Sequence, residues 1–129
     1  MRDYLHKEGA ELGLINLGGN IQTLGSRKGL GVGLKKPFAG DALIGTMTVE
    51  NLSVVTSGTY ERYFEQNGRR YHHILDPRTG YPLDNELDSV TIVSKDSIDG
   101  DIWTTLMYGM GVEKAALRCA LVLISKRFL

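Results

Sequence analysis

Residues 63–72 read YFEQNGRRYH and decide how the middle of the chain folds. Two short runs containing strand-forming aromatic residues flank Asn67 and Gly68. This pair is typical of two-residue hairpin turns, because both turn positions need a positive φ. The stretch therefore predicts two antiparallel strands joined by a tight turn.

Further strand candidates lie on both sides of this hairpin, separated by glycine, proline and asparagine. The chain opens with a helical segment that Gly9 closes, and a later helix capped by Asp96 or Ser97 should end at Gly109 or Gly111. The remaining predicted elements are strands at 12–17, 21–24, 30–34, 42–49, 52–56, 87–94 and 121–124 and a second late helix at 112–120. Together they predict an α+β fold, a largely antiparallel sheet with the two late helices packed on one face.

Length and composition exclude several classes. The 129 residues fit one domain with a real core, 1–129. Fifteen basic and fifteen acidic side chains leave no net charge to attract nucleic acid. No apolar run is long enough to span a membrane, and no signal peptide begins at Met1. The single Cys119 lies among helix formers, which predicts a buried structural thiol rather than a nucleophile.

The hairpin leads into HILDPRTGYP at residues 73–82. Pro77 and Gly80 make this a stiff turn, and it carries His73, Asp76 and Arg78 within six residues. A histidine held beside fixed charges suits phosphate binding or proton transfer. The alternative is a hairpin loop that has no functional role, since Asp-Pro-Arg-Thr-Gly is also a common sequence for a turn.

The first late helix carries a second candidate site. Asp101 and Thr105 are four residues apart and hence on one helix face, with Thr104 beside them. A carboxylate and a hydroxyl stacked in this way can hold Mg²⁺ together with waters and phosphate oxygens. The alternative is a solvated helix face with a satisfied threonine. The opposite, apolar stripe is expected to face the core and comprises Ile98, Ile102, Leu106 and Met110.

Five stretches together resemble the ApbE family of FAD:protein FMN transferases, formerly described as thiamine-biosynthesis lipoproteins. They follow the family's order and spacing from about Glu11 to Gly111. The stretches are NLGGNI (16–21), TSGTYERYF (56–64), HILDPRTGYP (73–82), SVTIV (89–93) and DIWTT (101–105).

The resemblance implies a transferase that binds FAD with Mg²⁺ at its pyrophosphate. Such enzymes pass the FMN half to a threonine or serine hydroxyl of an acceptor protein and release AMP. It also implies T-fold-like layers. Carried over residue by residue, the catalytic residue is His73, the FAD contacts are His73, Leu75, Asp76, Arg78 and Thr79, and the metal residues are Asp101, Thr104 and Thr105.

The chain also departs from the family pattern. Family members are expected to be about twice as long, which makes this chain the C-terminal half with part of a site. Trp103 is bulkier than the family's usual residue. An uncovered apolar surface in such a half predicts self-association. The resemblance implies a location on the extracytoplasmic side of the bacterial inner membrane, although the family's signal region is absent from this sequence.

Two other functions compete with FMN transfer. One is a flavin-binding module that hydrolyses FAD and transfers nothing, which the bulky Trp103 and the partial site both favour. The other is a truncated, inactive domain. FAD and Mg²⁺ are expected partners, and an acceptor protein is a further partner only if the chain transfers FMN.

Overall fold

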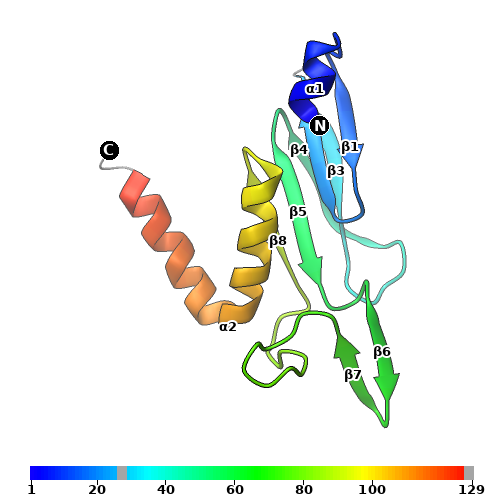
Figure 1. Cartoon of the computed structure of the whole chain (residues 1–129), viewed down its shortest axis with the longest axis vertical. Helices are drawn as coiled ribbons and strands as arrows, with labels where there is room; N and C mark the ends of the chain where they lie inside the picture. The colour runs from blue at the N-terminus through cyan, green and yellow to red at the C-terminus, as the bar shows by residue number, and fades with distance from the viewer. Residues whose placement is uncertain (26–28, 127–129) are drawn as a thin grey trace.

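The computed structural model describes residues 1–25 and 29–126, with residues 120–126 described by their backbone only. Its centre is a four-stranded sheet in the order β1-β2-β5-β8, in which every neighbouring pair is antiparallel (Figure 1). The strands are β1 (Gly13–Asn16), β2 (Asn20–Leu24), β5 (Ser53–Gly58) and β8 (Ser89–Ser94). The predicted α+β class with antiparallel strands is confirmed.

Two hairpins flank this sheet. The first joins β3 (Leu30–Lys35) to β4 (Leu43–Val49), and its register shifts between Leu34 and Lys35. The second joins β6 (Tyr63–Gln66) to β7 (Arg69–His72). Asn67 and Gly68 have φ angles of 52° and 72°, so the predicted hairpin turn is confirmed.

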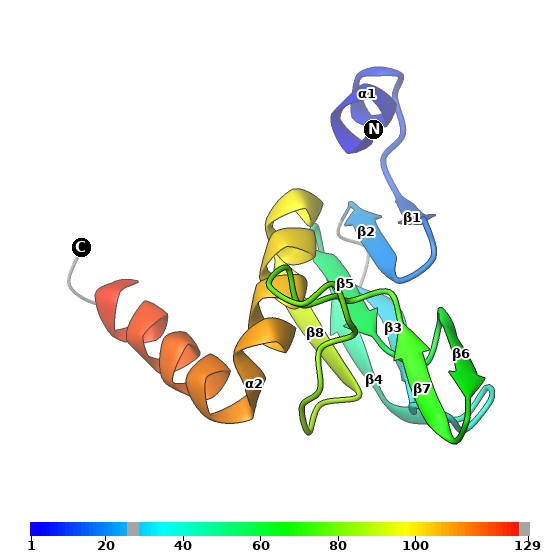
Figure 2. The same ribbon diagram turned by 60° about the horizontal axis from the view of Figure 1, so that its bottom comes forward.

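The apolar core lies between the central sheet and the β3–β4 hairpin. Val54 of β5 packs there with Val32 and Val49. Because side chains alternate along a strand, Val55 and Ser57 of β5 point to the opposite face. The first part of helix α2 (Ser97–Lys126) covers that opposite face, so the body has three layers (Figure 2).

Helix α1 (Arg2–Lys7) forms where the sequence predicts it. It is tied to the start of α2 by one side chain. The Arg2 guanidinium donates to the Lys95 carbonyl at 3.0 Å and to the Asp96 carboxylate at 3.1 Å. Residues that are 93 and 94 positions apart in the sequence are thereby brought together.

Helix α2 breaks at Gly111, whose φ of 74° and ψ of 170° are not helical. The predicted end of the first late helix is thus confirmed. The predicted strand at 121–124 is wrong, because the helix continues to Lys126. Once a helix exists, adding a residue costs little, whereas a lone strand needs a partner.

The second part of α2 does not pack as expected. In both views the helix leads away from the sheet after its bend, so only the first part lies on the sheet (Figures 1 and 2). Cys119 on this second part is exposed, which contradicts the predicted buried thiol. Among the described residues, no helix combines the length and the hydropathy needed to cross a membrane.

The face of α2 that meets the sheet is also not the one predicted. The expected core stripe is exposed, at 67% for Ile98, 52% for Ile102, 46% for Leu106 and 37% for Met110. The buried residues are instead Gly100, Thr104, Met107 and Tyr108. A β-carbon on Gly100 would lie 2.6 Å from Val55 Cγ2, so the missing side chain lets the helix backbone approach the strand and selects this face.

Candidate functional site

The loop of residues 73–82 is a closed, rigid turn. Asp76 N–H donates to the Tyr81 carbonyl at 2.8 Å, and the Asp76 carbonyl accepts from Gly80 N–H at 2.8 Å. Gly80 has a φ of 72°, which favours glycine. Ile74, only 6% exposed, anchors the loop, so its polar side chains are presented from a fixed backbone.

Two neighbouring histidines take different roles in this loop. His73 is exposed, and its Nδ1 lies 3.4 Å from the Arg62 carbonyl oxygen. A carbonyl only accepts, so Nδ1 carries the proton and Nε2 is the ring's acceptor. This tautomer suits a general base.

His72 faces the interior. Its Nε2 donates to the Leu83 carbonyl at 3.1 Å, its ring meets Tyr108 edge to face, and its Nδ1 is buried without a partner in the described part of the chain. Burial lowers the pKa of His72 and keeps the ring neutral. His72 is therefore a structural residue and His73 the candidate reactive one.

Asp76 and Arg78 form a paired charge at the loop tip. The Arg78 side chain donates to both carboxylate oxygens of Asp76, at 3.1 Å and 2.7 Å, and Arg78 N–H adds a third bond at 2.9 Å. The Arg78 guanidinium lowers the pKa of Asp76 to about 2, so Asp76 stays ionised. Arg78 is 85% exposed, and its remaining N–H donors are available to an anion.

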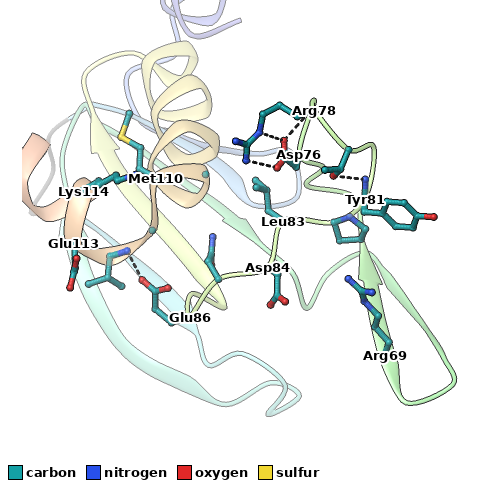
Figure 3. A pocket seen from close by; sticks show the side chains of 16 residues that line it. Arg69, Asp76, Arg78, Tyr81, Leu83, Asp84, Glu86, Met110, Glu113 and Lys114 are labelled. Carbon is teal, nitrogen blue, oxygen red and sulfur yellow. Dashed lines mark hydrogen bonds and ion pairs between the residues drawn. The ribbon is translucent and has the colours of Figure 1, made fainter.

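This loop forms one wall of an open cleft of about 1010 Å³. The other wall is the bend of α2 (Figure 3). There the Glu86 carboxylate accepts from Val112 N–H at 2.7 Å and so caps the second part of the helix. The charged lining residues are Arg69, Asp76, Arg78, Asp84, Glu86, Glu113 and Lys114.

The first part of α2 carries the predicted metal residues. Asp101 and Thr105 are exposed, and the Thr105 hydroxyl donates to the Asp101 carbonyl at 3.4 Å. Thr104 is fully buried, and its hydroxyl accepts from Ser57 Oγ and donates to the Asp101 carbonyl. Its geometry thus favours a supporting role for Thr104 over that of a ligand.

These residues fit a magnesium ion that keeps several waters. Among residues 1–25 and 29–119, no group of three or more acidic, histidine or cysteine side chains is placed so that it could hold a metal ion. Magnesium typically takes one or two carboxylates and completes its shell with water and substrate phosphates. One exposed carboxylate with a hydroxyl one turn away matches that donor set.

The structure brings together only some of the predicted site residues. Asp76, Arg78 and Thr79 line the cleft. The other predicted residues, which are His73, Leu75, Asp101, Thr104 and Thr105, are not among its lining residues. Leu75 is 50% exposed. Their roles as catalytic, FAD and metal residues stay predictions.

Arg69 and Glu86 are among the lining residues that sequence reasoning missed. Arg69 lies next to the hairpin turn, and its guanidinium lies over the Tyr71 ring at 5.6 Å from the ring centroid. Glu86 meets Val112 across 26 residues, and no local spacing signals such a contact.

Comparison with known proteins gives a consistent match. A family model described as "ApbE family" matches residues 1–121. A Klebsiella pneumoniae FAD:protein FMN transferase is 68% identical over 121 residues, which is 92% of this chain and 37% of that protein. The Treponema pallidum enzyme of the same name is 41% identical, over 84% of this chain and 33% of its own length.

Solved structures agree. The ApbE protein from Thermotoga maritima superposes with a TM-score of 0.70 at 39% identity, covering 77% of this chain and 32% of its own. The flavin transferase ApbE from Vibrio cholerae superposes with a TM-score of 0.72 at 31% identity, and the match covers 88% of this chain and 37% of that one. The matched part of the chain spans about a third of the length of these relatives.

Proposed function

The chain belongs to the ApbE family, and we propose that it takes part in the Mg²⁺-dependent transfer of FMN from FAD to a threonine or serine hydroxyl of an acceptor protein. The observation that carries this proposal is the tethered His73, on the motif loop of a chain 68% identical to an FAD:protein FMN transferase. We extend the proposal to T-fold-like layers and to action on the extracytoplasmic side of the bacterial inner membrane.

In the proposed reaction, the acceptor hydroxyl oxygen bonds to the phosphorus of the FMN half. The phosphorus–oxygen bond to AMP breaks, and AMP leaves with the bonding electrons. His73 Nε2 takes the hydroxyl proton, because Nδ1 already carries one and is directed at the Arg62 carbonyl. The exposed position of His73 gives an incoming protein side chain access to this nitrogen.

Two other groups of residues would stabilise the negative charge on the phosphates of FAD. Arg78 can donate to a phosphate oxygen with the N–H groups that Asp76 leaves free, and Asp76 fixes the orientation of its guanidinium. Asp101 and Thr105 would hold Mg²⁺, which when bound neutralises charge on the pyrophosphate and on the departing AMP. Contacts from the remaining two thirds of a relative's length are outside this chain.

The test mixes the chain with FAD, Mg²⁺ and a purified acceptor protein that a full-length relative flavinylates. Covalent flavin fluorescence on the acceptor after denaturing electrophoresis, with stoichiometric AMP, supports the proposal. The matched control is His73→Asn, which keeps a polar side chain and loses the basic nitrogen.

Other outcomes separate the competing functions. Free FMN and AMP without labelled acceptor would support FAD hydrolysis. The absence of both products and of flavin binding would support an inactive domain. If the His73→Asn variant flavinylates the acceptor at the wild-type rate, His73 takes no part in the reaction.

A further inference from the structure

A chain of hydroxyl groups connects the central sheet to a predicted metal ligand. Ser57 Oγ on β5 donates to Thr104 Oγ1 at 2.8 Å. Thr104 Oγ1 in turn donates to the carbonyl oxygen of Asp101 at 3.0 Å. Thr104 is 0% exposed, so the link lies in the interface between helix and sheet.

The geometry of α2 makes this link a fixed point for Asp101. Gly100 and Thr104 are four residues apart and face the sheet together, and Gly100 already approaches Val55 so closely that a β-carbon would not fit. Asp101 comes directly after Gly100 and Thr105 directly after Thr104, so both lie at the border of the same buried face. The two anchors therefore bracket the carboxylate along the helix.

A hydrogen-bonded anchor controls position more strictly than an apolar contact does. Donor and acceptor must keep their distance and angle, whereas aliphatic groups can slide by fractions of an ångström at little cost. The Thr104 hydroxyl both accepts and donates, and two hydrogen bonds linked in this way strengthen each other in a dry interface. The Ser57–Thr104 hydrogen bond thus restrains α2 against β5 close to Asp101.

We propose that Ser57 is a positioning residue that acts through Thr104 to hold Asp101 and Thr105 in the geometry that binds the divalent cation. The proposal rests on the proposed function, since it concerns the same metal site. Ser57 is not among the residues predicted to bind the metal or the flavin.

The neighbouring residue on β5 provides a matched control. Thr56 points to the other side of the sheet, where its hydroxyl lies 2.9 Å from that of Thr91 on β8. Thr56→Val removes a hydroxyl pair of similar length and burial that does not involve α2. A general loss of sheet stability would affect Thr56→Val and Ser57→Ala alike, whereas a loss of positioning affects only Ser57→Ala.

The experiment titrates Mn²⁺, a paramagnetic substitute for Mg²⁺, into the full chain and follows broadening of the Asp101 and Thr105 amide resonances. Ser57→Ala should weaken Mn²⁺ binding about tenfold, the usual size of effect for a partner of a metal ligand. Thr104→Val should do the same, and the double variant should lose no more than either single variant, because both interrupt one relay. Ser57→Thr, which keeps the hydroxyl, should restore wild-type affinity.

The outcomes separate the positioning role of Ser57 from the existence of the metal site. Wild-type affinity in Ser57→Ala, or an equal loss in Thr56→Val, would overturn the positioning role while leaving the metal site intact. A wild-type chain whose Asp101 and Thr105 resonances stay sharp in Mn²⁺ would remove the metal site and the positioning proposal together.

Discussion

Glu86 Oε1 accepts a hydrogen bond from the backbone N–H of Val112 at 2.7 Å. The bond joins the loop before β8 to the point at which α2 resumes after Gly111. It lowers the pKa of Glu86, because the N–H stabilises the ionised carboxylate. One carboxylate therefore ties the loop before β8 to the bend of α2, the cleft wall that faces the loop of Asp76 and Arg78.

We expect Glu86→Gln to loosen the second part of α2 without unfolding the sheet. Amide exchange at Val112 and the next turn should accelerate, measured by hydrogen exchange and NMR. The wild-type cap should be fully present above the unfolded-state pKa of Glu86 and be lost as the pH falls through its lower folded-state pKa. Glu113→Gln, in the same cleft, is the control and should change neither measurement.

Asp101→Asn should abolish Mg²⁺-dependent FAD turnover while leaving the thermal melt nearly unchanged, because Asp101 is exposed. Thr105→Val should weaken the metal less, since a neutral hydroxyl contributes less than a carboxylate to a hard cation. The comparison needs magnesium titrations of both variants and of Asp99→Asn, an acidic residue in the first turn of the same helix. Ordinary magnesium dependence in Asp101→Asn would show that this helix face is structural only.

The two adjacent histidines should respond oppositely to substitution. His73→Asn should keep the melting temperature and lose flavin transfer, whereas His72→Asn should lower the melting temperature, because His72 packs against Tyr108 and donates to Leu83. The His72 pKa is lowered on folding, so its contribution to stability is present above about 6.5 and declines as the pH falls towards the folded-state pKa. Thermal melts between about pH 5 and pH 8, the range in which histidine titrates, should show this decline in wild type and not in His72→Asn.

Gly100→Ala should destabilise the protein by about 1–3 kcal/mol, the usual cost of forcing an extra carbon into a packed interface. The new β-carbon would meet Val55 Cγ2 at 2.6 Å and Ser94 Oγ at 3.0 Å. Gly109→Ala is the matched control, because its β-carbon would lie 3.7 Å from Leu83 Cδ1, an ordinary contact. Urea denaturation that gave both variants the same free energy of unfolding would contradict the close approach of α2 to β5.

Leu106→Asp should leave folding intact, since Leu106 is 46% exposed and belongs to the outward stripe of α2. We expect the wild-type chain to self-associate weakly through this stripe, and the added charge should reduce that association. Size-exclusion chromatography at several concentrations measures the effect. A concentration-independent monomer in wild type would argue against self-association, and an unfolded Leu106→Asp would show that the stripe is buried after all.

The local sequence determined the elements whose geometry depends on a few neighbouring residues. Asn67 and Gly68 specify the hairpin because a tight turn needs positive φ at both positions. Gly111 specifies the break in α2 for a similar reason, and the motif at 73–82 identifies the rigid loop and the family. The central strands were predicted to within a few residues by their apolar runs and punctuation.

Only the tertiary structure decided which surfaces meet. Helical periodicity places four apolar residues on one stripe of α2, which are Ile98, Ile102, Leu106 and Met110, but it does not determine which way this stripe faces. In the structure, the close approach of Gly100 to β5 orients the helix so that Thr104 and Tyr108 are buried instead. Likewise, four apolar residues at 121–124 became helix because the chain entered them already helical. The partners of Ser57 and Glu86 are 47 and 26 residues away, and contacts at such separations depend on how whole elements pack rather than on any local pattern.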